Sequence, residues 1–150
     1  MAAEHTTTIR EEDEMKAGII NVTGYAGVEL ARLLKHHPEI ELEVVTGRSA
    51  VGEKLSDFFP HLGIDLTIEA EITESVDVVF SALPQTASAE SLGPLVNQGV
   101  KAIDISADFR LKDIAEYEEW YGAIHPYPDL VEEAVYGLTE LNRDPISKAR

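Results

Sequence analysis

One stretch near the amino terminus, residues 16–34, constrains the fold of this chain more than any other. It reads KAGIINVTGYAGVELARLL, which is typical of a buried strand, a tight turn with glycines and an amphipathic helix. In such a unit Gly24 allows backbone to approach a pyrophosphate, and Gly27 lets the helix pack close to the strand. Asn21 stands where the usual pattern has its first glycine, and asparagine is the other residue that readily adopts a positive φ. The stretch therefore predicts the opening unit of a dinucleotide-binding fold. Its predicted cofactor contacts are Thr23, Gly24, Tyr25, Ala26 and Gly27.

Strands and helices alternate along the rest of the chain. The apolar run over residues 76–83 is nearly continuous, which suits a strand that is buried on both faces of a parallel sheet. The predicted strands cover residues 16–22, 41–46, 66–70, 76–83, 101–106 and 134–138. The predicted helices cover residues 26–37, 87–98, 114–121 and 142–149. This order predicts an α/β, Rossmann-like fold with a mostly parallel sheet and helices on both faces.

Composition limits the kind of protein this can be. The chain has 150 residues, no cysteine and a formal net charge of −16, which argues against nucleic-acid binding because that needs a basic face. No apolar run reaches the length of a membrane span, and the acidic start is unlike a signal or transit peptide, so we expect a cytoplasmic protein without membrane contact. The five histidines lack metal-ligand spacing, and we assign no metal site. We expect residues 1–14 to be a disordered acidic extension and residues 15–150 to form one NADP-binding domain.

The end of the second predicted strand indicates which dinucleotide would bind. An acidic residue here would hold the ribose 2′-hydroxyl of NAD. This chain instead has Arg48 and Ser49, which can pair with the 2′-phosphate of NADP and donate a hydroxyl to it. The sequence therefore favours NADP as the cofactor. The alternative is that Arg48 is one more exposed arginine.

Two further loops follow the carboxyl ends of predicted strands, where ligands of open α/β sheets bind. Ala82, Leu83 and Pro84 would form a stiff wall for the cofactor, although an ordinary strand-to-helix turn accounts for them equally well. Ser106 and Arg110 are the candidates for the substrate side. Here the alternative is that Arg110 pairs only with Asp108.

Several segments together carry a resemblance to a known family. INVTGYAGVELARLL, TGRSAVGE, VVFSALPQ, VKAIDISADFRL, YEEWYG and EAVYGLTELNR occur in this order. They resemble the N-acetyl-gamma-glutamyl-phosphate reductases of arginine biosynthesis, and the resemblance covers residues 15–150. The segments ISADFRL and YGLTELNR are specific, whereas aspartate-semialdehyde dehydrogenases and other Rossmann enzymes share the glycine turn.

The resemblance implies the amino-terminal NADP-binding part of an enzyme that reduces a small acyl phosphate to a semialdehyde with NADPH. It matches residues 23–27 to the phosphate turn, Arg48 and Ser49 to the adenosine side, residues 82–84 to the cofactor side and residues 106–110 to the cleft. The family's cysteine nucleophile, later histidine and dimer-forming domain lie beyond these residues. The resemblance thus implies a homo-oligomeric whole enzyme and a chain that is inactive alone, with no catalytic residue of its own.

Two positions depart from the family pattern: Asn21 replaces a glycine, and Gln85 stands where members often have histidine. Two alternatives to this interpretation stay open. The chain could be a non-catalytic nucleotide-binding or regulatory module, or part of the related lysine-pathway reductase.

Overall fold

A computed structural model describes residues 15–149, and its centre is a single five-stranded sheet. The strands lie in the order β3-β2-β1-β4-β5, and every neighbouring pair is parallel. Their bounds are β1 Met15–Ile20, β2 Ile40–Thr46, β3 Ile68–Glu69, β4 Val78–Ser81 and β5 Lys101–Asp104. Strand order therefore runs outward in two directions from the central pair, β1 and β4.

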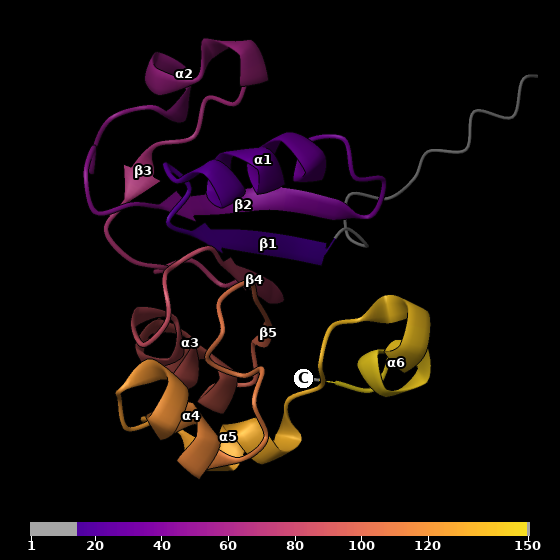
Figure 1. The fold of residues 1–150 in the computed structure, drawn as a ribbon. Helices are drawn as coiled ribbons and strands as arrows, with labels where there is room; N and C mark the ends of the chain where they lie inside the picture. Colours follow the sequence, from indigo (N-terminus) through magenta and orange to yellow (C-terminus); the bar gives the residue numbers. More distant parts are fainter. Residues whose placement is uncertain (1–14, 150) are drawn as a thin grey trace, which may run out of the picture.

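The helices connect and flank these strands. Helix α1 (Tyr25–Leu34) joins β1 to β2, and α3 (Ala87–Asn97) joins β4 to β5. Between β2 and β3 lie α2 (Leu55–Phe58) and a 3-10 turn, η1 (Pro60–Leu62); after β5 come α4 (Ile114–Tyr121), α5 (Pro128–Glu133) and α6 (Thr139–Ile146). Figure 1 shows α1 beside β1 and β2, and α3, α4 and α5 gathered near β4 and β5. Helix α6 stands apart in this view and has no buried residue.

Helices lie on both faces of the sheet, as the sequence predicts. Ile19 pairs with Phe80 in the register, and both pack in one core cluster with the buried α1 residue Ala31. The next register pair points the other way because side chains alternate along a strand. From that pair, Ser81 meets Ser88 of α3, with their hydroxyl oxygens 2.7 Å apart. Each fully buried Ile, Leu or Val in the cluster contributes about 1.5–3 kcal/mol through removal from water.

The strand predicted over residues 134–138 is wrong. These residues have no regular structure, and they follow α5, a helix that the sequence analysis missed. These residues read AVYGL, a short apolar run that resembles a buried strand, but a strand needs a partner for its backbone groups. The ammonium group of Lys112 instead donates hydrogen bonds to the carbonyl oxygens of Val131, Glu132 and Ala134. The carbonyl groups at the end of α5 therefore find their partner in one side chain and not in a neighbouring strand.

The predicted acidic extension, residues 1–14, lies outside the described residues. Within residues 15–149, no helix is both long enough and apolar enough to span a membrane.

Candidate functional site

The strand order identifies one crevice at the carboxyl edge of the sheet. The connection from β1 leads toward β2, and the connection from β4 leads toward β5, so the topology switches direction between β1 and β4. Ligands of open parallel sheets bind outside the strand ends at such a point. Two segments flank it here. One is the turn after β1, residues 21–27, which contains the residues predicted to bind phosphate and is called the phosphate turn below. The other is the β4–α3 loop, residues 82–86.

The phosphate turn has the geometry that its sequence predicts. Asn21 adopts φ +67°, the left-handed conformation expected of a residue in place of glycine. A Cβ added at Gly27 would lie 2.2 Å from the Asn21 carbonyl oxygen and 2.7 Å from the Val22 Cα, so only glycine fits there. Gly24 is the N-cap residue of α1, and no side chain caps the helix there. The first amides of α1 therefore have no capping side chain, which suits them to an anion.

The loop after β2 lies beside this turn. A Cβ added at Gly47 would be 3.5 Å from the Thr23 Cγ2, and the Val22 amide donates to the Thr46 carbonyl at 2.8 Å. Arg48 and Ser49 follow immediately, and both are exposed. The structure thus brings the predicted adenosine-side residues next to the predicted phosphate turn. The residues of the phosphate turn differ in exposure: Gly27 is buried, Tyr25 is 98% exposed, and Ala26 is also exposed.

The β4–α3 loop completes the crevice on its other side. Leu83 is buried, whereas Pro84 is exposed at the surface. The Ala82 carbonyl accepts a hydrogen bond from Asn21 Nδ2 at 2.9 Å, so the loop is tied directly to the phosphate turn. Thr86 ends the loop with φ +70° and ψ −52°, which is a strained conformation for a residue with a Cβ.

Sequence reasoning missed a buried carboxylate that organises this edge. Asp108 is fully buried and accepts hydrogen bonds from the Thr86 amide, the Ala89 amide and the Tyr117 hydroxyl, each at 2.7–2.8 Å. No ion pair joins Asp108 and Arg110 among the residues that the structure describes, so the pairing considered from the sequence is absent there. A signal was available, since an aspartate among apolar residues needs buried donors.

Ser106 belongs to the same polar network. Its hydroxyl donates to Asp104 Oδ2 at 2.7 Å and accepts from the Asp108 amide at 3.1 Å. Asp104 Oδ1 also accepts from Ser88 Oγ of α3 at 2.6 Å. The predicted substrate-side hydroxyl is therefore engaged in holding β5, α3 and the following loop together. Arg110 is exposed beyond it.

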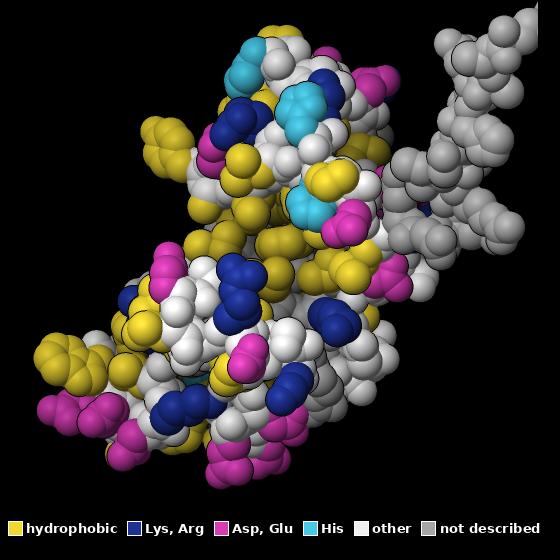
Figure 2. Space-filling view, turned by 90° about the vertical axis from the view of Figure 1, so that its right-hand side faces the viewer, with side chains coloured by type: hydrophobic (Ala, Val, Ile, Leu, Met, Phe, Trp, Pro, Cys, Tyr) yellow, Lys and Arg dark blue, Asp and Glu magenta, His cyan; other side chains and the backbone are white. Residues whose placement is uncertain are grey.

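An apolar groove lies along the β4–β5 half of the face that α1 covers elsewhere. Its lining includes Ser106 and Arg110 together with Val78, Phe80, Ile103 and Ile105. Ile103 is 48% exposed and Ile105 is 43% exposed. In the space-filling view, apolar side chains gather at the floor of a hollow (Figure 2). The two predicted substrate-side residues thus border an open apolar surface.

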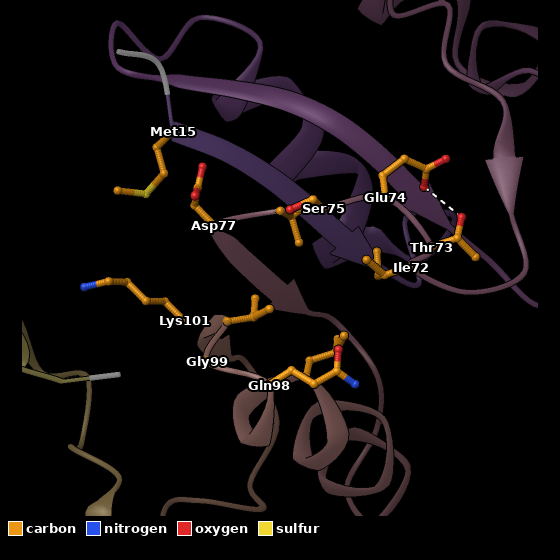
Figure 3. Close-up of a pocket in the computed structure, with 12 residues that line it drawn as sticks. Met15, Ile72, Thr73, Glu74, Ser75, Asp77, Gln98, Gly99 and Lys101 are labelled. Carbon is orange, nitrogen blue, oxygen red and sulfur yellow. Dashed lines mark hydrogen bonds between the residues drawn. The ribbon is translucent and has the colours of Figure 1, made fainter. Parts of the chain in front are cut away.

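A second pocket lies at the opposite, amino edge of the sheet. Figure 3 shows Met15 at the start of β1, Asp77 just before β4 and Lys101 at the start of β5 around it. None of the predicted cofactor or substrate residues lines this pocket. Over residues 15–149, no cluster of three His, Asp or Glu side chains is placed to hold a metal ion. The candidate site is therefore the crevice at the carboxyl edge.

Two buried aromatic groups beside Asp108 have shifted proton affinities. Burial, followed by the hydrogen bond to Asp108, raises the pKa of the Tyr117 hydroxyl far above its ordinary value. Burial lowers the pKa of His125, and the neighbouring carboxylates of Asp108 and Asp104 only partly oppose this. His125 is 3% exposed, and its Nδ1 accepts from the Tyr127 amide at 3.1 Å. Both shifts favour the neutral form of the side chain.

We expect the His125→Asn variant to lose part of the acid sensitivity of folding. The lowered pKa of His125 means that its contribution to stability is complete above the ordinary value of 6.5 and declines as pH falls below it. Asparagine keeps a short acceptor for the Tyr127 amide but does not titrate. Urea midpoints at pH 7.5 and pH 5.5 measure the effect. The wild type and the exposed control His36→Asn should show the larger fall, and an equal fall in all three proteins would contradict a role for His125.

Comparisons with known proteins agree with the geometry. Residues 16–149 match the family described as semialdehyde dehydrogenase, NAD binding domain. An N-acetyl-gamma-glutamyl-phosphate reductase from Dehalococcoides mccartyi (strain BAV1) is 59% identical to this chain over 90% of the chain's length. The enzyme of the same name from Thiobacillus denitrificans is 48% identical over 91% of the chain's length. The chain spans only 40% and 41% of their lengths. The crystal structure of a Candida albicans aspartate semialdehyde dehydrogenase with NADP shares the fold, with a TM-score of 0.53 and 24% identity over 67% of this chain and 32% of that one.

These relatives bear out the resemblance that the sequence segments carry. The family match extends over nearly all of the described residues, from β1 to the residues that follow α6. The chain belongs to the semialdehyde dehydrogenase NAD-binding domain family.

Proposed function

We propose that this chain is the NADP-binding part of an N-acetyl-gamma-glutamyl-phosphate reductase, and that the whole enzyme reduces a small acyl phosphate to a semialdehyde. The identity of 59% to a relative of that name, over 136 residues, is the observation that carries the proposal. The whole enzyme would be a cytoplasmic homo-oligomer. Because this chain has no cysteine, it would supply cofactor binding and not the nucleophile.

Under this proposal, the arrangement of the loops supports one direction for the bound cofactor. Arg48 and Ser49 follow β2, the phosphate turn follows β1, and residues 82–86 follow β4, which are three neighbouring strands. A dinucleotide is a linear molecule, so its 2′-phosphate would lie near Arg48 and its pyrophosphate over the start of α1. Its remaining half would then extend over the β4–α3 loop. When bound, NADPH supplies the hydride, and the residues of this chain bind and orient it.

We expect replacement of Arg48 by alanine to weaken the binding of NADPH but not that of NADH. The guanidinium group can pair with the 2′-phosphate of NADPH, which NADH lacks. A lost charge-assisted pair of this kind costs about 1.5–3 kcal/mol, or roughly 10- to 100-fold in affinity. Calorimetric titration should therefore show weaker NADPH binding by the variant and NADH binding that is nearly unchanged.

A matched control distinguishes the position from the charge. Arg32 on α1 is also an exposed arginine, and its guanidinium pairs with Glu29 on the same helix. Arg32→Ala changes the net charge by the same amount, and we expect it to leave NADPH affinity within about twofold of wild type. An equal loss of affinity in both variants, or none in Arg48→Ala, would refute the role of Arg48. Absence of any NADPH binding by the wild-type chain would refute the proposal as a whole.

A further inference from the structure

The β4–α3 loop is held at both of its ends by side chains from other parts of the chain. At its first residue, the Ala82 carbonyl accepts from Asn21 Nδ2 at 2.9 Å. At its last residue, the Thr86 amide donates to Asp108 Oδ1 at 2.8 Å. These two bonds join segments that are 61 and 22 residues apart in the sequence. The loop thus has fixed ends although it lies at the surface of the crevice.

The backbone of the loop is strained at Thr86, so the loop needs contacts that hold it in place. Thr86 has φ +70° and ψ −52°, a conformation that costs a residue with a Cβ about 1–3 kcal/mol. Such a conformation persists only where the surroundings impose it. Asp108 is placed to do so, because its Oδ2 accepts from the Ala89 amide of α3 and its Oδ1 also accepts from the Tyr117 hydroxyl of α4. Asp108 is therefore fixed from two helices and fixes the loop in turn.

Asn21 acts at the opposite end and crosses the switch point itself. It leaves β1 with φ +67°, a conformation that glycine would adopt more easily. Glycine, however, has no side chain to reach the Ala82 carbonyl in the β4–α3 loop. The substitution in this chain therefore replaces conformational freedom with a cross-link between the phosphate turn and the β4–α3 loop.

We propose that Asn21 and Asp108 are positioning residues that fix the β4–α3 loop against the nicotinamide half of the bound cofactor. This inference rests on the proposed function, which places that half of the dinucleotide over residues 82–86. Neither side chain has to touch the cofactor. Each acts through a backbone group of the loop, the carbonyl of Ala82 or the amide of Thr86.

The test compares a whole cofactor with its adenosine half. NADPH spans the crevice, whereas 2′,5′-ADP carries the 2′-phosphate and one 5′-phosphate and has no nicotinamide. We expect Asn21→Gly and Asp108→Asn to weaken NADPH binding about tenfold, since each removes or disrupts one hydrogen bond that fixes the loop. Binding of 2′,5′-ADP should stay within about twofold of wild type. The family pattern that this chain resembles has glycine at position 21, so we expect the phosphate end to remain competent.

Ser88→Ala is the matched control for a general loss of stability. It removes the hydrogen bond that this buried side chain donates to Asp104 and involves neither Asn21 nor Asp108, so both loop contacts stay in place. It should lower the melting temperature and leave both affinities unchanged when titrated well below that temperature. If Asp108→Asn does not fold, Asn21→Gly alone decides the question.

The outcomes separate this inference from the proposed function. A selective loss of NADPH affinity in the two variants supports it. Unchanged NADPH affinity, or equal weakening of NADPH and 2′,5′-ADP, overturns it while the proposed function stands. A wild-type chain that binds neither ligand overturns the proposed function and this inference with it.

Discussion

Replacing Gly27 by alanine is expected to destabilise the fold and to abolish cofactor binding. The new Cβ would lie 2.2 Å from the Asn21 carbonyl oxygen and 2.7 Å from the Val22 Cα, which are backbone atoms that cannot rotate away. Alanine is favoured over glycine inside a helix by about 1 kcal/mol, so helix propensity alone would predict a gain. The overpacking cost is larger, about 3 kcal/mol, and it acts where α1 meets β1. The clash therefore decides the sign.

Urea denaturation measures this effect, and two other glycines provide controls. A Cβ at Gly24 would lie 3.2 Å from Asn21 Nδ2, which is a side-chain atom and is 1 Å farther away than the backbone oxygen that a Cβ at Gly27 would meet. A Cβ at Gly137 would meet nothing within 4 Å. We expect Gly24→Ala to lose less than about 1 kcal/mol and Gly137→Ala to be near neutral. A Gly27→Ala protein with the urea midpoint of Gly137→Ala would show that the turn tolerates a side chain.

The second large effect is expected from Asp108→Ala. This change removes the acceptor of three buried donors, namely the amides of Thr86 and Ala89 and the hydroxyl of Tyr117. Each buried donor left without a partner costs about 1–3 kcal/mol, and water entering the vacated space recovers part of this. We expect a loss of about 3–5 kcal/mol, compared with about 5–15 kcal/mol for the total stability of a typical domain.

An exposed aspartate with similar contacts shows whether burial is the cause. Asp65 accepts from Lys54 Nζ at 2.7 Å and from Ser56 Oγ at 3.0 Å, yet its side chain is 67% exposed. Water can replace both partners after Asp65→Ala, so that variant should lose only a small fraction of the Asp108→Ala effect. Free energies of unfolding from urea curves allow the comparison. Equal losses in the two variants would argue against a special role for the buried carboxylate.

The sequence was sufficient to predict the five parallel strands of the sheet, the first helix and the general place of the candidate site. The alternation of buried strands and helices requires parallel pairing, and parallel strands end at the same edge. Residues after β1, β2 and β4 were therefore expected together, and they are together. The close packing at Gly27 could also be predicted. Glycine is unfavourable inside a helix, so a glycine in the first turn of α1 indicates that other backbone lies against it.

The contacts that hold the loops were not predictable in the same way. Asn21 reaches Ala82 and Asp108 reaches Thr86 only because the sheet places distant segments side by side, and periodicity carries no information about such partners. Residues 134–138 illustrate the opposite error. Their local pattern resembles a strand, but the structure has none there. Lys112 donates hydrogen bonds to the carbonyl oxygens at the end of α5, and that contact cannot be predicted from local sequence.

The central position of β1 and β4 has a consequence for how the chain reaches its fold. Ala17 of β1 pairs with Val78 of β4, so the middle of the sheet cannot close until about sixty further residues have been made. Closing such a long loop costs entropy before any contact repays it, and folds with distant pairings form slowly for their size. During synthesis β1 can pair with β2 early, but its other edge waits for β4. The newborn chain therefore exposes a half-finished sheet, and that interval is when chaperones or misassociation would act on it.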